Sequence, residues 1–239
     1  MWADILSALL SIAIALIVAI PLGKQLKEKP WVFYIAAGVL VAAYLFYRFT
    51  SGAYIPWLQP FLDMMGKGYL ACAFLAVVMF TGVFDEGTEI RRKLQPVRAE
   101  LSIISFILIL GHAIAYLPSY IPVLGRLFSL RATMAFSIIL AVVLIVIFAV
   151  LTVTSFRELR AKIPYKTWKN IQRGSYVMVA LLWLHIFLVL SRSAFGGHGS
   201  ESAQFALIVY TVIVVAYAAL RIWKAVRDHK KAQAAAEEK

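Results

Sequence analysis

The chain has 239 residues, of which 62% are apolar and only 15% charged, with a mean hydropathy of +0.83. An ordinary soluble domain is nearer to half apolar and a quarter charged. This composition excludes a soluble enzyme, a disordered tail and a nucleic-acid-binding domain, so the net charge of +12 needs another explanation. The single cysteine, Cys72, lies in an apolar run and is expected to be a small buried hydrophobe.

Long apolar stretches recur along the chain, and each holds close to the ~20 residues that a helix needs to cross a bilayer. Lipid offers the backbone no hydrogen-bond partner, so each stretch is expected to be helical. The sequence therefore predicts an all-α membrane protein, a bundle of about seven transmembrane helices. The spans are predicted at residues 3–22, 31–49, 67–84, 100–117, 132–153, 175–192 and 204–223.

The distribution of lysine and arginine predicts the orientation of this bundle. With the N-terminus outside, 19 of the 24 basic residues fall in inner segments and 5 in outer ones. Cytoplasmic loops carry such an excess, so the pattern predicts an outer N-terminus and a cytoplasmic C-terminus. The membrane is expected to be the plasma (inner) membrane of a bacterium. Residues 224–239 form a basic, Ala-rich cytoplasmic tail, and the bilayer rather than nucleic acid accounts for the positive charge.

Two histidines are the candidate functional residues within the spans, where ionisable groups are costly. His112 and His185 each precede the predicted outer end of an outward-running helix by six residues, about 9 Å. Neutral imidazoles at one level on facing helices can ligate a single heme iron. The small residues Gly111 and Ala115 are expected to leave room for the macrocycle. The alternative is that each histidine only hydrogen-bonds a neighbouring helix.

Short motifs surround both histidines. They are Arg98-x-x-Leu101 before His112, then Leu151-x-x-Thr154-Ser155, Trp168 to Tyr176, and Leu181 to His185. Together they resemble the ferric reductase-like transmembrane domain superfamily, and within it the MsrQ-type heme-binding membrane subunits. The resemblance covers residues 31–223 and implies a six-helix heme-binding domain, with residues 1–30 as an extra N-terminal transmembrane helix and inner loop.

One departure from the superfamily bears on the number of hemes. Relatives often carry a second histidine 13 residues before the later ligand, where this chain has Gln172, and the matching place on the other helix is Arg98. Neither side chain replaces a histidine as an iron ligand. The resemblance therefore implies one heme b, with His112 and His185 as its axial ligands. Arg98 and Gln172 are expected to be interface polar residues or to hold a quinone head group or FMN.

Three outer cations lie nearest to the proposed heme edge in the sequence. Arg126, Arg131 and Arg192 are candidates to contact the heme propionates. They serve equally well as anchors that hold the outer loops at the lipid headgroups.

The resemblance implies a b-type cytochrome subunit. Such a subunit carries electrons from quinol or a cytoplasmic flavoprotein, through one bis-histidine heme near the outer side, to an extracytoplasmic reductase or flavoprotein. The spans show no catalytic acid, base or nucleophile, so an electron-transfer subunit without its own substrate-converting site is expected. The alternative is a small-solute transporter or a membrane scaffold without heme.

Overall fold

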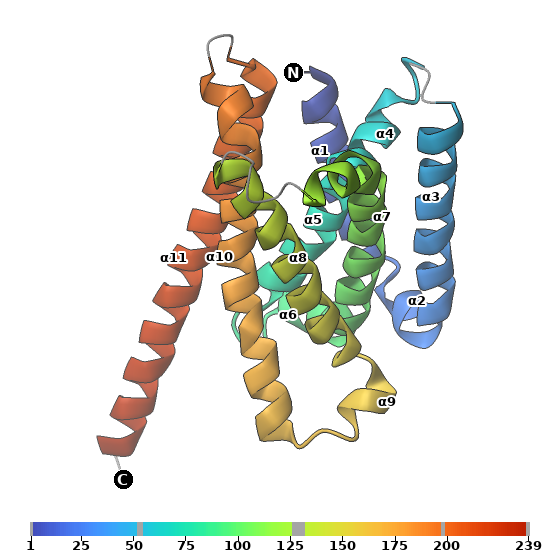
Figure 1. Cartoon of the computed structure of the whole chain (residues 1–239). Coiled ribbons are helices and arrows are strands. Elements are labelled where there is room, and N and C mark those ends of the chain that lie inside the picture. The colour runs from blue at the N-terminus through green and yellow to red at the C-terminus, as the bar shows by residue number, and fades with distance from the viewer. Residues whose placement is uncertain (1, 52–54, 126–131, 197–198, 238–239) are drawn as a thin grey trace.

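The fold is a bundle of helices, seen here in a computed structural model that describes residues 2–51, 55–125, 132–196 and 199–237 (Figure 1). Within these residues there is no strand, which confirms the all-α prediction. The helices are α1 (Trp2–Ala19), α2 (Gly23–Glu28), α3 (Pro30–Thr50), α4 (Gln59–Gly66), α5 (Tyr69–Thr81), α6 (Glu89–Leu94), α7 (Arg98–Leu124), α8 (Ala132–Val153), α9 (Arg157–Arg160), α10 (Tyr165–Phe195) and α11 (Glu201–Glu237), with a 3-10 turn, η1 (Gln95–Val97), before α7.

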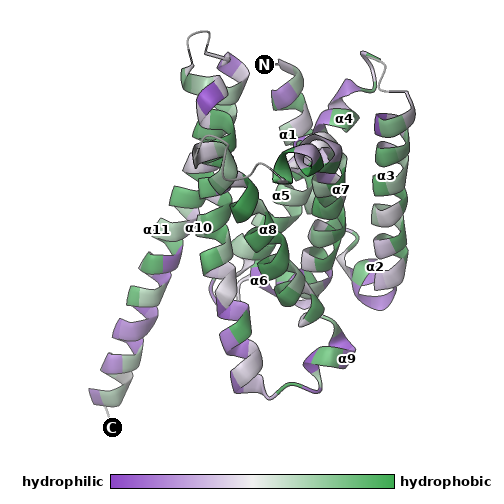
Figure 2. Ribbon diagram, viewed as in Figure 1, coloured by the Kyte–Doolittle hydropathy of each residue, from purple (hydrophilic) through white to green (hydrophobic). Residues whose placement is uncertain are grey.

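Six helical segments of the described chain are long and apolar enough to cross a membrane, and α4 with α5 makes a seventh only as a bent pair. Many large apolar side chains of these helices point outward, as lipid-facing residues do, for example Ile35 and Val142 at 58% and 57% exposure. Figure 2 shows apolar residues along the middle of the bundle and hydrophilic ones at the end that carries α2, α9 and the C-terminus. We call this end the basic end. The chain is a multi-pass membrane protein.

The span predicted over residues 67–84 contains a shorter helix, which is joined to a second helix before it. The helix α5 has only 13 residues, and α4 meets it at a bend of 58°. The bend lies at Gly68, whose φ of +73° is a left-handed conformation that interrupts a right-handed helix. We call Gly66 to Gly68 the hinge.

Other helix ends also differ from the sequence prediction. The helix α7 continues through Pro118 and Pro122, where the span was expected to end at residue 117. Proline is tolerated there because membrane helices recover the lost backbone contacts from their neighbours. The helix α10 begins at Tyr165 rather than near residue 175, and α11 continues into the basic tail as far as Glu237. Most of the segment expected to be a loop at 157–173 is therefore helical.

Two clusters of buried apolar side chains form the core, and α5 contributes to both. The first cluster joins α5 to α1, α3, α4 and α7, with Leu70, Phe74 and Leu101 among its members. The second joins Leu75 and Met79 on the other face of α5 to α8, α10 and α11. The helix α5 is therefore buried on both sides, and the candidate histidines belong to the helices that surround it.

Candidate functional site

His112 is held by the hinge rather than by another side chain. Its Nδ1 atom lies 2.7 Å from the main-chain oxygen of Gly66, the last residue of α4. A carbonyl oxygen only accepts, so Nδ1 carries the hydrogen and Nε2 keeps a free lone pair. Metal-bound histidines commonly donate their other ring N–H to a backbone carbonyl, which fixes the tautomer and the ring orientation. His112 is thus oriented as a ligand through Nε2 would be.

Glycine is required where the hinge passes His112. A Cβ atom on Gly68 would lie 3.6 Å from Nδ1 of His112 and 3.4 Å from Cδ1 of Ile109, at a φ that disfavours other residues. A Cβ atom on Gly66 would lie 2.9 Å from the hydroxyl of Tyr44. The hinge therefore sits tightly between α3 and α7, and its backbone can reach the histidine ring.

Lys67, between the two glycines, anchors the hinge to its neighbours. Its Nζ atom pairs with the buried carboxylate of Asp4 on α1 and lies 3.3 Å from Oδ2 of Asp63 on α4. Asp4 also accepts a hydrogen bond from Ser202 at the start of α11. These ion pairs were not predicted from the sequence. A lysine between two glycines at the predicted start of a span does, however, indicate a charged group that needs a partner there.

His185 lies half-buried on α10, and its Nδ1 atom is buried without a hydrogen-bond partner in the described part of the chain. Buried polar atoms normally have a partner, and an exception calls for an explanation such as a missing ligand. The backbone of Ser137 on α8 lies near the ring, and His112 is close enough to interact with it electrostatically. Both α7 and α10 pack against α8, so the two histidines that the sequence singled out lie on the helices that flank α8.

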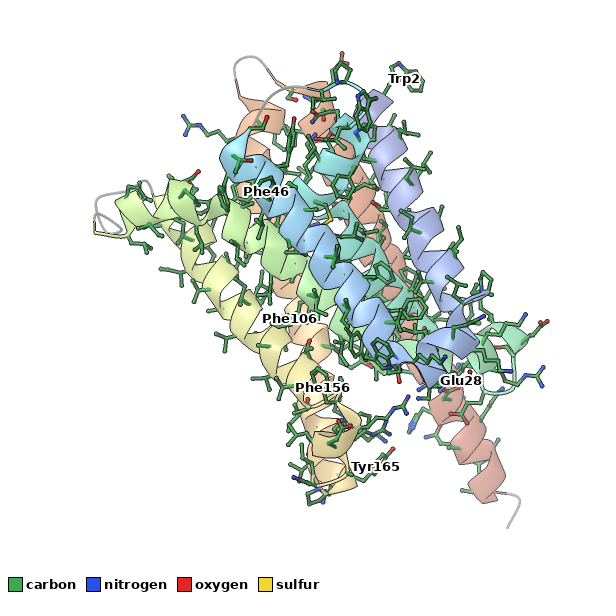
Figure 3. All side chains as sticks on the ribbon, turned by 90° about the vertical axis from the view of Figure 1, so that its right-hand side faces the viewer. Trp2, Glu28, Phe46, Phe106, Phe156 and Tyr165 are labelled. Carbon is green, nitrogen blue, oxygen red and sulfur yellow. The ribbon has the colours of Figure 1, made fainter. Side chains whose placement is uncertain are left out.

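Chain neighbours of both histidines pack against the second apolar cluster. Ile109, one turn before His112, packs against it from α7, and Leu184 and Leu188 pack against it from α10. Figure 3 is viewed from the side of α3, with Phe106 labelled on α7 behind it. The ring of Phe106 packs 5.3 Å from that of Phe148 on α8.

The small residues Gly111 and Ala115 do not provide the room expected of them. A Cβ atom on Gly111 would lie 2.9 Å from Cγ1 of Val41, so this glycine allows the close approach of α3 and α7. Ala115 is buried in the first apolar cluster. Gly111 therefore faces α3, and Ala115 is part of the apolar core.

The inner polar residues Arg98 and Gln172 make separate contacts. Arg98 Nε donates to the main-chain oxygen of Val78 on α5 at 3.1 Å. Gln172 Nε2 donates to the main-chain oxygen of Leu151 at 3.1 Å and to the hydroxyl of Thr154 at 3.0 Å. Gln172 thus joins α10 to the C-terminal end of α8, which is an interface role.

The three candidate propionate contacts are only partly placed. Arg192 is exposed in the last turn of α10, at the end of the bundle away from the basic end. Arg126 and Arg131 lie outside the described residues.

An apolar cavity of about 110 Å³ lies beside the site, between α1, α5, α10 and α11. Trp183 and Ile186 of α10 line it, as do Ala8 of α1 and Ala76 of α5, but neither histidine does. The cavity is therefore separate from the histidine pair.

The long apolar helices make this protein a multi-pass helical membrane protein. Two histidines on its helices α7 and α10 are the candidate ligands. Residues 67–183 match the family described as "Ferric reductase like transmembrane component". The match begins at Lys67 within the hinge, includes His112 and ends two residues before His185. It supports a similarity to the ferric reductase-like transmembrane superfamily.

An "Uncharacterized protein" of Treponema pallidum (strain Nichols) is 30% identical to this chain over 231 residues. The aligned region is 95% of this chain and 63% of the relative, so the chain spans less than two thirds of that protein's length. No solved structure matches the chain.

Proposed function

We propose that the protein is a b-type cytochrome subunit of the MsrQ type, with one heme b ligated by His112 and His185. The observation that carries the proposal is the pair of rings itself. One imidazole is oriented by a main-chain oxygen with Nε2 left free, and the other has a buried nitrogen without a partner. A heme iron with both axial positions filled by histidine supplies a one-electron carrier.

The chain's own residues would orient the ligands and keep water out. The Gly66 oxygen fixes the His112 tautomer and its ring orientation. The Lys67 ion pairs with Asp4 and Asp63 keep the hinge in place, so that this oxygen stays within reach. The second apolar cluster, against which Ile109 and Leu184 pack beside the two histidines in the chain, would lower the local dielectric.

The proposed position of the heme follows from the length of α7. Arg98 begins α7 at the basic end, and His112 lies 14 residues further along, about 21 Å. If the basic end is cytoplasmic, as the positive-inside pattern predicts, the heme lies toward the outer side. We therefore propose quinol or a cytoplasmic flavoprotein as the donor and an extracytoplasmic reductase or flavoprotein as the acceptor, with Arg192 available to a propionate.

The absorbance spectrum of the purified full chain tests this proposal. Protein from heme-replete cells should show a Soret band and, after reduction, a sharp α band typical of a bis-histidine b-type cytochrome. A colourless protein that is correctly inserted would contradict the proposal and favour the transporter or scaffold alternative.

A further inference from the structure

We infer that three arginines at the basic end of the bundle bind a phosphate group. Arg91 on α6, Arg98 on α7 and Arg221 on α11 come from distant parts of the sequence and gather at the end of α5. We call them the arginine triad. This inference concerns the end of the bundle opposite to the hinge and does not depend on the heme proposal.

The triad surrounds a single helix end. Arg98 Nε donates to a main-chain oxygen of α5 at 3.1 Å, and Arg91 Nη1 donates to one just beyond that helix at 2.7 Å. Arg221 donates to another main-chain oxygen there and to the hydroxyl of Tyr176. The accepting main-chain oxygens belong to Val78 for Arg98, Gly82 for Arg221 and Phe84 for Arg91.

The positive charges of the triad are poorly balanced. The cations that act electrostatically on Arg98 are Arg91 and Arg221. Within the described residues no carboxylate lies within ion-pair distance of Arg98 or Arg221. Arg91 pairs only with Glu86, a side chain that is 89% exposed. Charges removed from water normally have a counter-charge, because desolvation is otherwise too costly. A cluster of guanidinium groups with little compensation therefore favours an anion.

Capping of α5 explains part of this arrangement but not all of it. The last carbonyls of a helix carry partial negative charge and are stabilised by a nearby cation. However, each guanidinium has five N–H donors, and the contacts above use one or two of them. The remaining donors form the planar forks that bind phosphate oxygens in pairs. Three guanidinium groups around one helix end supply more N–H donors than are needed to cap its last carbonyls.

The position of the triad fits two sources of phosphate. Arg221 lies 20 residues, or about 30 Å, beyond the start of α11, a distance close to the thickness of the hydrocarbon core. The triad thus lies near the level of the headgroups at the basic end. A phospholipid headgroup can reach it from the leaflet, and a free phosphate compound can reach it from water.

The test compares full-length variants purified in detergent. Arg98→Gln and Arg221→Gln each remove one fork, and Arg92→Gln removes an equal charge from an exposed neighbour on α6. Native mass spectrometry measures retention of phosphatidylglycerol against a phosphate-free galactolipid. Thermal unfolding in sodium phosphate against sodium chloride at equal ionic strength measures binding of free phosphate.

We expect the unmodified protein and Arg92→Gln to bind a phosphate probe, and both triad variants to bind it about tenfold more weakly. A response to phosphatidylglycerol alone identifies the lipid as the source, and a response to inorganic phosphate identifies a free compound. Equal weakening by Arg92→Gln would reduce the effect to diffuse charge and overturn the inference. No binding of either probe would leave the triad as a cap of α5.

A conservative variant covers the case in which Arg98→Gln does not fold. Arg98→Lys keeps the charge and a donor for Val78 but lacks the planar fork. It should fold and insert normally and bind the phosphate probe severalfold more weakly. Binding equal to that of the unmodified protein would contradict the inference.

Discussion

The Nδ1 atom of His112 lies 2.7 Å from the main-chain oxygen of Gly66, so the orientation of this ring depends on the hinge between α4 and α5. The position of the Gly66 oxygen is set by the backbone conformation of the hinge. Gly68 must keep a positive φ for α5 to start where it does, and the ring packs directly against this glycine. The orientation of the candidate ligand His112 therefore depends on the bend between α4 and α5.

Replacing Gly68 with alanine should destabilise the protein. The left-handed backbone costs a residue with a Cβ atom about 1–2 kcal/mol, while the new methyl group would meet His112 and Ile109 only at ordinary contact distances. The control is Gly38→Ala in α3, where no atom lies within 4 Å of the added Cβ. Thermal unfolding in detergent should show a lower midpoint for Gly68→Ala only. Equal midpoints would show that the hinge does not need its glycine.

The buried carboxylate of Glu100 should show strong coupling to its two cations. Its Oε1 atom lies 3.2 Å from Lys27 Nζ and 3.0 Å from Arg157 Nη2, and the side chain is 3% exposed. Replacing both cations with methionine leaves a buried charge unpaired and should cost about 3–5 kcal/mol. Adding Glu100→Gln should restore most of the loss, as measured by denaturant unfolding in mixed micelles. Purely additive effects would contradict this coupling.

Asp85, in the turn between α5 and α6, should make stability depend on acid pH. Its hydrogen bond from Lys224, together with the charges of Arg227 and Lys224, lowers the pKa of this carboxyl below its ordinary value. A lowered folded pKa stabilises the folded state above the unfolded pKa of about 4, and this contribution is lost as pH falls through the folded value. Unfolding midpoints between pH 6 and pH 3 should therefore fall less steeply in Asp85→Asn. Parallel curves would contradict the prediction.

The number of hemes should be one per chain. Gln172 hydrogen-bonds the end of α8, and Arg98 hydrogen-bonds the end of α5, so neither side chain is free to serve a second iron. A pyridine hemochrome assay against quantitative amino-acid analysis measures the ratio. A value near two would show that the inner position holds a second heme despite its lack of histidine.

The sequence predicted most of the helices because their apolar runs match the thickness of a bilayer. It also singled out His112 and His185, since ionisable side chains stand out in such runs. The bend before α5 was missed because the residues after Gly68 are apolar whether or not the helix is broken. The partner of His112 was missed for a different reason: it is a main-chain oxygen, and the sequence pattern of side chains does not reveal it.

The sequence also could not predict which neighbouring helix the small residues pack against. Gly111 and Ala115 lie beside His112 in the chain, yet Gly111 faces Val41 of α3 and Ala115 is buried in the first apolar cluster. Which face of a uniformly apolar helix meets its neighbour depends on packing, and apolar residues around the whole circumference leave no periodic signal.

Paired histidine variants test the central claim most directly. We expect His112→Ala and His185→Ala each to abolish the reduced α band while the protein remains inserted in the membrane and at normal abundance. His229→Ala, which changes an exposed histidine in the C-terminal part of α11, should keep the full band. If either His112→Ala or His185→Ala retains a full complement of heme with an unchanged spectrum, that residue is not an axial ligand and the account is contradicted.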